Sequence, residues 1–361
     1  MINGKVRILI VDDSAFMRKS LSLLLASDPD IEIIGQAKNG LEGVKMAKEL
    51  LPDVITLDIE MPVMDGLTAL KQIMIECPAP VLMISSLTTE GADSTLKALE
   101  LGAVDFIPKE MSFVNVGITA IKDDLIRKVK TIARRRSLTE TLSRLRSIRN
   151  VRKSTSITTP SQSTGRIPRK YGFSAIAIGI STGGPLSLQK VIPILSPRAI
   201  KCPVFIVQHM PPKFTKSLAD RLNDLSEIKV KEAEHNDIVE AGTVYLAPGG
   251  YHMTVRKKSF ISQVIEISEN PSNTLHRPSV DVMMTSVVET YGRKTLGVIM
   301  TGMGKDGLEA IKLLKSTGGY SIAQDEDSCV VYGMPKAIVD ANLADEIISL
   351  QRIAETINAV V

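Results

Sequence analysis

The chain has 361 residues, a length that predicts two domains rather than one. Its composition, with 44% hydrophobic and 23% charged residues, is typical of a globular protein. Aromatic residues make up only 4% of the chain and tryptophan is absent, which argues against a stacking surface for single-stranded nucleic acid. No apolar run is long enough to span a bilayer, so we expect no direct membrane insertion.

The cysteines indicate the compartment. There are three of them, far apart and in no C-x-x-C pattern, which argues against a disulfide framework and against a zinc knuckle. The first residues lead directly into an apolar run without the pattern of a signal peptide. We therefore expect a cytoplasmic protein.

The basic charge is concentrated in one segment. Between Arg134 and Lys170 there are eleven basic residues and one acidic residue, Glu140, so this segment carries +10 and the remainder −6 of the overall +4. Such a segment can bind nucleic acid or lipid, but a solvated, self-repelling tether is the simpler interpretation. We predict a basic flexible linker over residues 137–171 and no nucleic-acid partner.

Apolar runs alternate with amphipathic stretches before this linker. Five runs are expected to be strands: residues 6–11, 31–35, 54–57, 81–84 and 104–107. Helical spacing is found in residues 16–27, 40–51, 67–76 and 92–101, and a last helix is expected over about 117–136. This alternation predicts an open parallel sheet with helices on both faces, forming a domain over residues 1–136.

A second alternating body is expected over residues 172–361. Its strands are expected at residues 175–180, 204–208, 243–247, 253–256, 264–267, 295–300 and 321–323. Its helices are expected at residues 186–195, 214–226, 280–291 and 308–316. The pattern predicts a doubly wound, mostly parallel α/β domain with a hairpin inserted around residues 244–268.

Polar side chains follow the expected strands of the first domain, and the carboxyl ends of parallel strands meet at one edge. Three carboxylates there repel one another unless a cation lies among them, and all-oxygen ligation favours Mg²⁺. The expected Mg²⁺ ligands are Asp12, Asp13 and Asp58. Asp58 is also the expected phosphoryl acceptor, with Lys109 as counter-charge and Ser85 as hydroxyl donor. For any one of these residues, a simple polar end of a strand is the favoured explanation, but that explanation is weak for all five at matching strand ends.

Three phrases of this half resemble response-regulator receiver domains, which have a flavodoxin-like five-stranded fold. They are Val11-Asp12-Asp13-Ser14, Asp58-Ile59-Glu60-Met61-Pro62-Val63-Met64-Asp65-Gly66 and Gly102-Ala103-Val104-Asp105-Phe106-Ile107-Pro108-Lys109. The resemblance implies an aspartyl phosphate at Asp58, a switch residue at Phe106 and a histidine kinase as phosphodonor. Glu110 stands where the family usually has proline, so the usual cis peptide is not expected there.

A serine-hydrolase pattern follows the linker. Gly179-Ile180-Ser181-Thr182-Gly183 satisfies G-x-S-x-G between an expected strand and a helix, where the turn exposes the serine and the helix N-terminus favours negative charge. His209 and Asp306 follow later strands and are the candidate base and orienting acid. Each has an alternative: a glycine-rich turn without chemistry, a packed strand-end histidine, and a helix N-cap paired with Glu309.

The order Ser, His, Asp differs from that of α/β-hydrolases, so that fold is rejected. The second half instead resembles chemotaxis protein-glutamate methylesterases. The phrases that carry this likeness are Ile180-Ser181-Thr182-Gly183-Gly184-Pro185, Gln208-His209-Met210-Pro211, Leu246-Ala247-Pro248-Gly249-Gly250-Tyr251-His252-Met253, His276-Arg277-Pro278-Ser279-Val280-Asp281, Thr301-Gly302-Met303-Gly304-Lys305-Asp306-Gly307 and Ala323-Gln324-Asp325-Glu326.

The resemblance implies the nucleophile Ser181, the base His209 and the acid Asp306, with the Met303 N–H in the oxyanion hole and Thr182 shaping the site. It also implies hydrolysis of glutamate methyl esters on methyl-accepting chemotaxis receptors, with release of methanol, and deamidation of receptor glutamines. No cofactor is expected in this half. His252 and His276 are expected to support loops around the site.

Two rival functions are a transcription regulator and an adaptor without catalysis. A transcription regulator would combine the receiver with a compact helix-turn-helix module, but the sequence that follows is long and rich in strands. An adaptor with the same fold and no catalysis is the second rival, which intact Ser181, His209 and Asp306 speak against.

Overall fold

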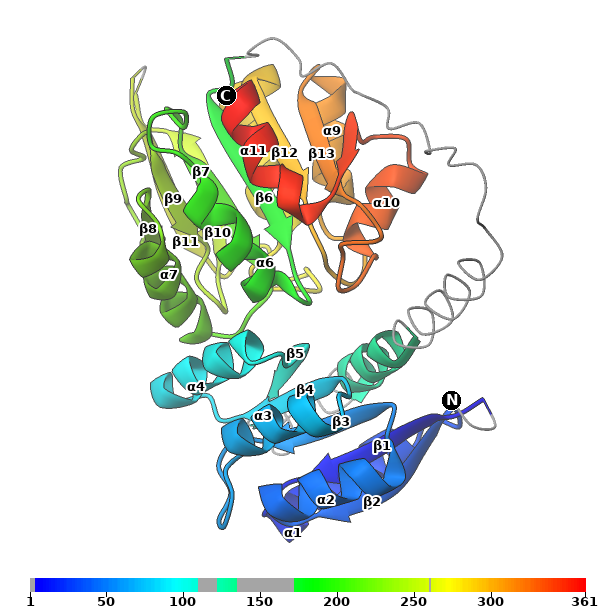
Figure 1. Ribbon diagram of the computed structural model, residues 1–361. Coiled ribbons are helices and arrows are strands. Elements are labelled where there is room, and N and C mark those ends of the chain that lie inside the picture. The colour runs from blue at the N-terminus through cyan, green and yellow to red at the C-terminus, as the bar shows by residue number, and fades with distance from the viewer. Residues whose placement is uncertain (1–3, 110–121, 135–171, 260) are drawn as a thin grey trace, which may run out of the picture. The chain divides into compact units, whose positions relative to one another are not determined.

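The computed structural model describes residues 4–109, 122–134, 172–259 and 261–361 (Figure 1). The chain divides into two compact units, and each unit contains its own parallel sheet. The linker predicted over residues 137–171 lies outside the described residues, as does Glu110. Within the described ranges, no helix combines the length and apolar character needed to cross a membrane.

The first unit is a five-stranded sheet in the order β2-β1-β3-β4-β5, with every neighbouring pair parallel. Its strands are β1 (Val6–Val11), β2 (Ile31–Ala37), β3 (Val54–Asp58), β4 (Val81–Ser85) and β5 (Asp105–Pro108). The helices in this part of the chain are α1 (Ala15–Ala26), α2 (Gly40–Leu50), α3 (Gly66–Glu76), α4 (Thr89–Glu100) and an unlabelled helix over 122–134. The predicted receiver-like fold is confirmed.

Alternate residues of β1 point to opposite faces of this sheet, as the pleat requires. Ile8 and Ile10 belong to an apolar cluster with α1 and the 122–134 helix. Val11 lies on the other face and packs against Gly43 of α2. Side-chain caps at Ser14, Asn39 and Asp65 start α1, α2 and α3. Strand-helix alternation and capping therefore place the polar ends of β1, β3, β4 and β5 at one edge.

The second unit is a seven-stranded sheet in the order β14-β13-β12-β6-β7-β9-β8, again with all pairs parallel. Its strands are β6 (Ala175–Ile180), β7 (Val204–Gln208), β8 (Lys229–Glu232), β9 (Thr243–Leu246), β12 (Thr295–Ile299), β13 (Tyr320–Gln324) and β14 (Glu346–Ile348). A separate antiparallel hairpin joins β10 (His252–Lys257) to β11 (Gln263–Ser268).

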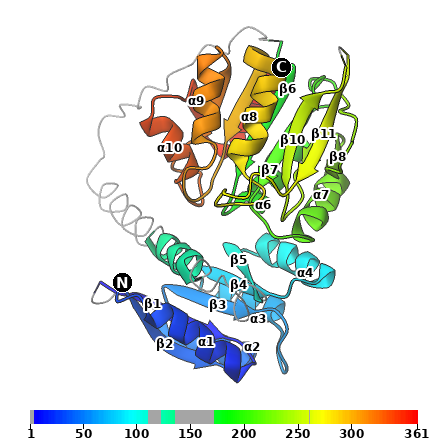
Figure 2. The same ribbon diagram turned by 180° about the vertical axis from the view of Figure 1, so that it is seen from behind.

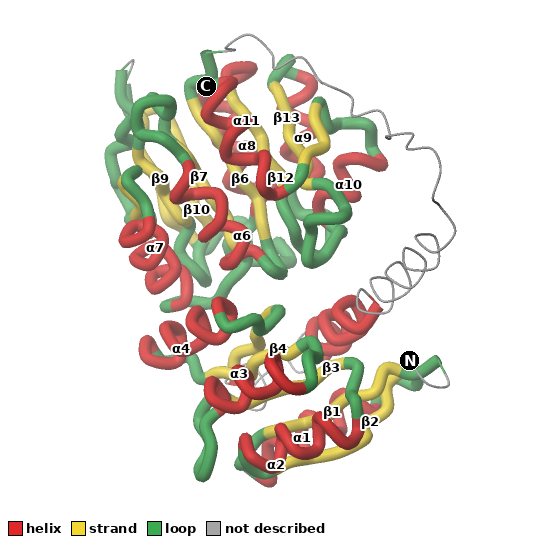
Figure 3. The backbone as a smooth tube through the Cα atoms, viewed as in Figure 1, coloured by secondary structure: helices red, strands yellow, loops and turns green. Residues whose placement is uncertain are grey.

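Helices cover both faces of the seven-stranded sheet. They are α6 (Gly184–Val191), α7 (Phe214–Leu225), α8 (Val280–Tyr291), α9 (Leu308–Ser316), α10 (Met334–Asp340) and α11 (Leu350–Val360), with short 3₁₀ turns η2 (Ile192–Ile194) and η3 (Gly292–Lys294). Helices α6 and α11 lie in front of the sheet in Figure 1, whereas α8, α9 and the hairpin are in front in the reverse view of Figure 2. Figure 3 shows the same layering by element type.

The apolar residues explain this layering. Alternate side chains of the central strands, such as Ala177 and Phe205, join α8, α9 and the hairpin in one buried cluster. Their neighbours Ile176 and Ile178 are fully buried as well. Central strands that are buried on both faces carry near-continuous apolar sequence, which is why the sequence revealed them.

The predicted doubly wound fold is confirmed, with differences at its margins. The inserted hairpin is narrower than the predicted 244–268, because Thr243–Leu246 pairs within the main sheet as β9. Strands β8 and β14 and helices α10 and α11 were not predicted. Strand β8 has the sequence Lys-Val-Lys-Glu, with Val230 as its one buried residue, so an edge strand of this kind has no apolar run to recognise.

Candidate active site and phosphorylation site

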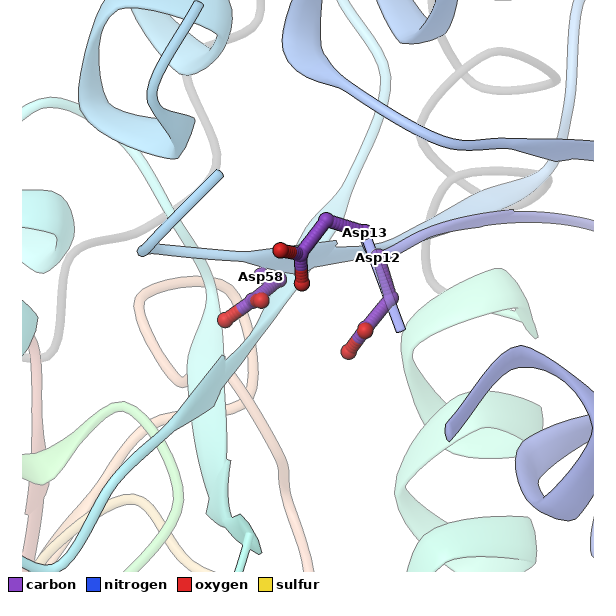
Figure 4. Close-up of side chains that lie close together, drawn as sticks. All are labelled: Asp12, Asp13 and Asp58. Atoms are coloured by element: carbon purple, nitrogen blue, oxygen red, sulfur yellow. The ribbon is translucent and has the colours of Figure 1, made fainter. Parts of the chain in front are cut away.

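The polar edge of the first unit gathers three carboxylates (Figure 4). Asp12 and Asp13 follow β1 and Asp58 ends β3, and their carboxylate oxygens lie within 4.8 Å of one another. Asp12 and Asp58 are buried, while Asp13 is exposed. The structure therefore brings together the residues predicted as a metal site.

Lys109 is the nearest cation of this pocket. Its Nζ lies 2.7 Å from Asp58 Oδ2 and 3.9 Å from Asp12 Oδ2. Burial raises the pKa of Asp58 to about 6, and the charge of Asp12 adds to this, whereas the hydrogen bond from Lys109 opposes it. Burial also raises the pKa of Asp12. One lysine thus does not neutralise the two buried carboxylates.

A divalent cation fits this set of oxygens. Asp12 Oδ2 is buried and accepts no hydrogen bond from any described residue. Three carboxylates without nitrogen or sulfur ligands match the preference of Mg²⁺ for oxygen and retained water. Asp12, Asp13 and Asp58 are the residues that would hold the ion. Ser85 lies buried at the end of the neighbouring strand β4, and Phe106 lies buried within β5.

The pKa of Asp58 predicts how stability depends on pH and Mg²⁺. A carboxyl whose pKa is higher in the folded state, here about 6 instead of 3.8, contributes most stability below pH 4 and loses it as pH rises through 6. The difference between these two pKa values lowers the free energy of unfolding at neutral pH by about 3 kcal/mol. We expect Asp58→Asn to stabilise the Mg²⁺-free first unit at pH 7 and Mg²⁺ to stabilise the wild type more than the variant. Chemical denaturation at pH 4.5 and 7, with and without Mg²⁺, checks this; equal stabilities throughout would contradict it.

In the second unit, two candidate catalytic residues lie on adjacent strands. Ser181 follows β6 and His209 follows β7, and the preceding residues Ile180 and Gln208 are register partners. The His209 N–H donates to the Ile180 carbonyl at 3.2 Å. Register and pairing therefore hold the predicted nucleophile and base at one edge of the sheet.

Asp306 binds the imidazole of His209. The distance between His209 Nε2 and Asp306 Oδ2 is 2.8 Å, and both side chains are largely buried. Burial alone would raise the pKa of Asp306, but the hydrogen bond and charge of His209 hold this pKa well below its usual range. Asp306 is therefore ionised at neutral pH.

The ring nitrogens of His209 have different surroundings. Nε2 faces the carboxylate and carries the proton of that bond, whereas Nδ1 is buried and has no hydrogen-bond partner among the described residues. In the usual triad the carboxylate binds Nδ1 and the serine faces Nε2. Here the carboxylate lies at Nε2 instead, and Nδ1 is the nitrogen without a partner among the described residues.

Backbone geometry shapes the turn at Ser181. The Ser181 N–H donates to the Thr301 carbonyl at 3.0 Å, and its own carbonyl accepts from Gly184 N–H at 2.8 Å. Gly183 has a φ of 74°, in the left-handed region that favours glycine. A Cβ at position 302 would lie 2.8 Å from Ser181 Cβ, so Gly302 must be glycine for the two loops to approach.

The predicted shaping residues lie in these loops. Thr182 is buried, and its carbonyl accepts a hydrogen bond from the Thr301 hydroxyl at 3.0 Å. Met303 is half-buried in the loop between β12 and α9 that also carries Asp306. The oxyanion role of the Met303 N–H stays a prediction.

The alternative explanation of Asp306 as an N-cap of α9 is wrong. The N-cap residue of α9 is Gly307, and no side chain caps it there. Asp306 instead accepts the N–H groups of Val280 at 2.7 Å and Asp281 at 3.0 Å, at the start of α8. It also accepts the Ser279 hydroxyl at 3.0 Å.

Sequence reasoning missed a buried glutamine. Gln208 Nε2 donates to the carbonyls of Ser181 at 3.0 Å and His209 at 3.2 Å, so one amide ties the two loops together. Its side chain is 2% exposed. A polar residue ending an otherwise apolar strand beside the base was the available signal.

The two remaining site histidines differ in role. His252 Nδ1 accepts the Ser279 N–H at 3.2 Å, and its Nε2 lies 3.2 Å from the Pro271 carbonyl, so it supports a loop as predicted. His276 does more, because its ring stacks on that of His209 with centroids 4.1 Å apart. It therefore covers one face of the candidate base.

Comparison with known proteins identifies the families that the two halves of the chain match. Residues 8–118 match the response regulator receiver domain family, and residues 176–357 match the CheB methylesterase family. A Lawsonia intracellularis protein named protein-glutamate methylesterase/protein-glutamine glutaminase is 49% identical, covering 97% of this chain and 98% of its own. A Pyrococcus horikoshii protein of the same name is 46% identical over 99% of this chain and 94% of its own.

A solved structure resembles the second half of the chain. The Thermotoga maritima CheB methylesterase catalytic domain is 41% identical, with a TM-score of 0.51, and the match covers 52% of this chain and 99% of that one. The matches to whole relatives extend over nearly the full length of both chains and include both domain types. The chain therefore belongs to the CheB methylesterase family whose members carry a response regulator receiver domain.

Proposed function

We propose that this chain is a protein-glutamate methylesterase that uses Ser181, His209 and Asp306 as its catalytic triad. The observation that carries the proposal is the 2.8 Å bond between His209 and Asp306, at the same strand edge that presents Ser181. The substrate is the methyl ester of a glutamate side chain on a methyl-accepting chemotaxis receptor. Full-length relatives bear the name of this activity.

The geometry suggests how the residues act. Ser181 attacks the ester carbonyl while His209 Nδ1 takes the hydroxyl proton and then returns it to the departing methanol. Asp306 fixes the ring through Nε2 and stabilises the imidazolium that forms. The N-terminus of α6, directly after the serine turn, and the Met303 N–H favour the developing oxyanion, with Thr182 shaping the turn. Water then hydrolyses the acyl-enzyme.

Glutamine deamidation follows from the same chemistry. A glutamine side chain gives the same acyl-enzyme as a glutamyl ester, with ammonia as the leaving group in place of methanol. The names of the relatives include protein-glutamine glutaminase. We assign this second activity to the same three residues.

The first unit serves as the control domain of this enzyme. A chemotaxis histidine kinase donates a phosphoryl group to Asp58. Asp12, Asp13 and Asp58 would hold a Mg²⁺ ion, which would neutralise charge during the transfer. Lys109 binds the transferred oxygens, Ser85 donates a hydroxyl, and Phe106 is the switch. Phosphorylation raises methylesterase activity by shifting a conformational equilibrium.

The remaining assignments concern the domain boundaries, the cellular location and the cofactor content of the protein. We assign residues 1–136 to the receiver, 137–171 to a basic linker and 172–361 to the catalytic domain. We assign the protein to the cytoplasm, where kinase and receptor tails are accessible, with no cofactor in the catalytic domain.

The direct test measures methanol release from membranes that contain methylated receptors, with and without acetyl phosphate and Mg²⁺. Turnover that rises with the phosphodonor supports both the proposed methylesterase activity and its control by phosphorylation. Absence of turnover with intact fold would favour the rival adaptor.

A further inference from the structure

Two helices begin side by side next to the candidate triad, and each is capped from the other. Asp306 precedes α9 in sequence but accepts the N–H groups of Val280 and Asp281 in the first turn of α8. Asp281, in that first turn of α8, accepts the Ala310 N–H in the first turn of α9 at 2.8 Å. The two carboxylates therefore form a reciprocal cross-cap of α8 and α9.

Helix α9 needs a cap from outside its own sequence. Its N-cap residue, Gly307, has a φ of 99° and no side chain to accept an N–H. A Cβ at this position would lie 2.8 Å from Ile299 Cδ1 and 2.9 Å from Val280 Cγ1, so packing excludes a larger residue. The first N–H groups of a helix lack intrahelical acceptors, and Asp281 supplies the missing one for Ala310.

The cross-cap determines where the Asp306 carboxylate lies. Its Oδ1 accepts from Ser279 Oγ and Asp281 N–H, and its Oδ2 accepts from Val280 N–H and His209 Nε2. Three of these four donors belong to the start of α8. The bond to His209 therefore has the right length only if the starts of α8 and α9 keep their relative position.

Apolar packing alone leaves this relative position underdetermined. Met283 and Met284 of α8 join Ala310 and Ile311 of α9 in the buried cluster, and such contacts allow small sliding motions of helices. Hydrogen bonds at the two helix starts are directional and resist such sliding. The bond from Ala310 to Asp281 ties helix α9 itself to α8, in addition to the bonds that Asp306 accepts from the start of α8.

We propose that Asp281 is a positioning residue of the active site, which holds Asp306 against His209 through the reciprocal cross-cap of α8 and α9. This inference rests on the proposed triad and adds a residue that does not touch the substrate. A displacement of about 1 Å at a catalytic group lowers turnover by up to about 100-fold. The effect belongs in kcat rather than KM, because Asp281 acts on the base and not on substrate binding.

Two substitutions distinguish the loss of the hydrogen-bond acceptor at position 281 from the loss of its negative charge. Asp281→Asn keeps an oxygen that accepts the Ala310 N–H but carries no charge, and Asp281→Ala removes the acceptor. Burial raises the pKa of the Asp281 carboxyl, and the charge of Asp306 adds to this, so the neutral amide is the milder change. We expect Asp281→Ala in the full chain to lower kcat by about 10- to 100-fold with KM unchanged, and Asp281→Asn to stay within about 3-fold of wild type.

Asp345→Ala is the matched control. Asp345 accepts the Ser321 N–H at 2.7 Å at the amino end of β13 and pairs with Lys315 in the last turn of α9. It therefore binds the same helix at the end away from the triad. We expect a loss of thermal stability similar to that of Asp281→Ala but wild-type kcat. An equal kcat loss in the control, or wild-type kcat in Asp281→Ala, would overturn the inference.

Nuclear magnetic resonance detects the hydrogen bond between His209 and Asp306 directly, so this measurement does not depend on enzyme turnover. The chain has four histidines, so isotope-labelled histidine gives a simple spectrum. The proton between His209 Nε2 and Asp306 is expected far downfield in the wild type and Asp281→Asn, and lost to exchange in Asp281→Ala. An unchanged resonance in Asp281→Ala would contradict the inference. If the alanine variant does not fold, Asp281→Leu, which is similar in shape to aspartate and also lacks an acceptor, takes its place with the same expected results.

The measurements distinguish this inference from the proposed triad. Near-normal turnover in Ser181→Ala would contradict the triad, and the resonance of His209 would still decide whether Asp281 positions Asp306. Loss of turnover in Ser181→Ala together with full turnover in Asp281→Ala would contradict only the inference.

Discussion

Replacing Ser181 with alanine is expected to lower methanol release by about 1,000-fold or more, because the variant lacks the hydroxyl that attacks the ester. Ser181 lies in a turn held by main-chain hydrogen bonds to Thr301 and Gly184, which the substitution keeps. The melting temperature should therefore change little. Initial rates on methylated receptor membranes, together with a thermal melt, measure both quantities.

A matched variant controls for general damage to the edge of the sheet. Ser187→Ala removes a hydroxyl that donates to the Gly183 carbonyl at 2.8 Å, one turn into α6. We expect this variant to keep most of its turnover. If Ser181→Ala retained near-normal turnover, the nucleophile would have to be another group, and the triad would be wrong.

Replacing Asp58 with asparagine is expected to abolish both phosphoryl uptake and activation by phosphodonor. Asparagine has nearly the same shape, so it keeps an oxygen near Lys109, but its amide is a poor nucleophile towards phosphorus. Radiolabelled acetyl phosphate with Mg²⁺ measures uptake, and the ratio of methanol-release rates with and without phosphodonor measures activation. Basal turnover should remain, because the triad is intact.

Two further proteins sharpen this test. Asp53→Asn alters a carboxylate that accepts the Arg7 N–H at 2.9 Å at the start of β3, away from the acidic pocket, and should be phosphorylated normally. A fragment of residues 172–361, which corresponds to the separately solved Thermotoga maritima domain, should hydrolyse ester without responding to phosphodonor. Labelling of Asp58→Asn at the wild-type level would mean that a different carboxylate is the acceptor.

The sequence predicted those parts of the fold and site that local patterns determine. Central strands such as β6 and β7 carry unbroken apolar runs, and the polar residues directly after them, Ser181 and His209, lie where strand ends predict. The acidic pocket was predictable for the same reason, since Asp12 and Asp58 end neighbouring strands. Edge strand β8 was not, because a charged sequence with one buried residue resembles a loop.

The rest depends on contacts between residues distant in sequence. The alternative explanation of Asp306 was a cap for α9, and only the packing of α8 beside α9 reveals that it caps α8 instead. The position of Asp306 at Nε2 of His209, and not at Nδ1, is set by the direction from which Asp306 approaches the ring. The stacking of His276 on His209 also joins segments that no periodicity relates.

The buried amide of Gln208 makes the edge of the sheet sensitive to chemical ageing. Hydrolysis of this side chain to a carboxylate would replace a nitrogen that donates to two carbonyls, those of Ser181 and His209, with an oxygen that repels both. We expect Gln208→Glu, which mimics the aged protein, to lose more turnover than Gln208→Met, which lacks the repulsion; the methanol assay compares them. An enzyme proposed to deamidate glutamines in its substrate thus depends on one glutamine of its own remaining an amide.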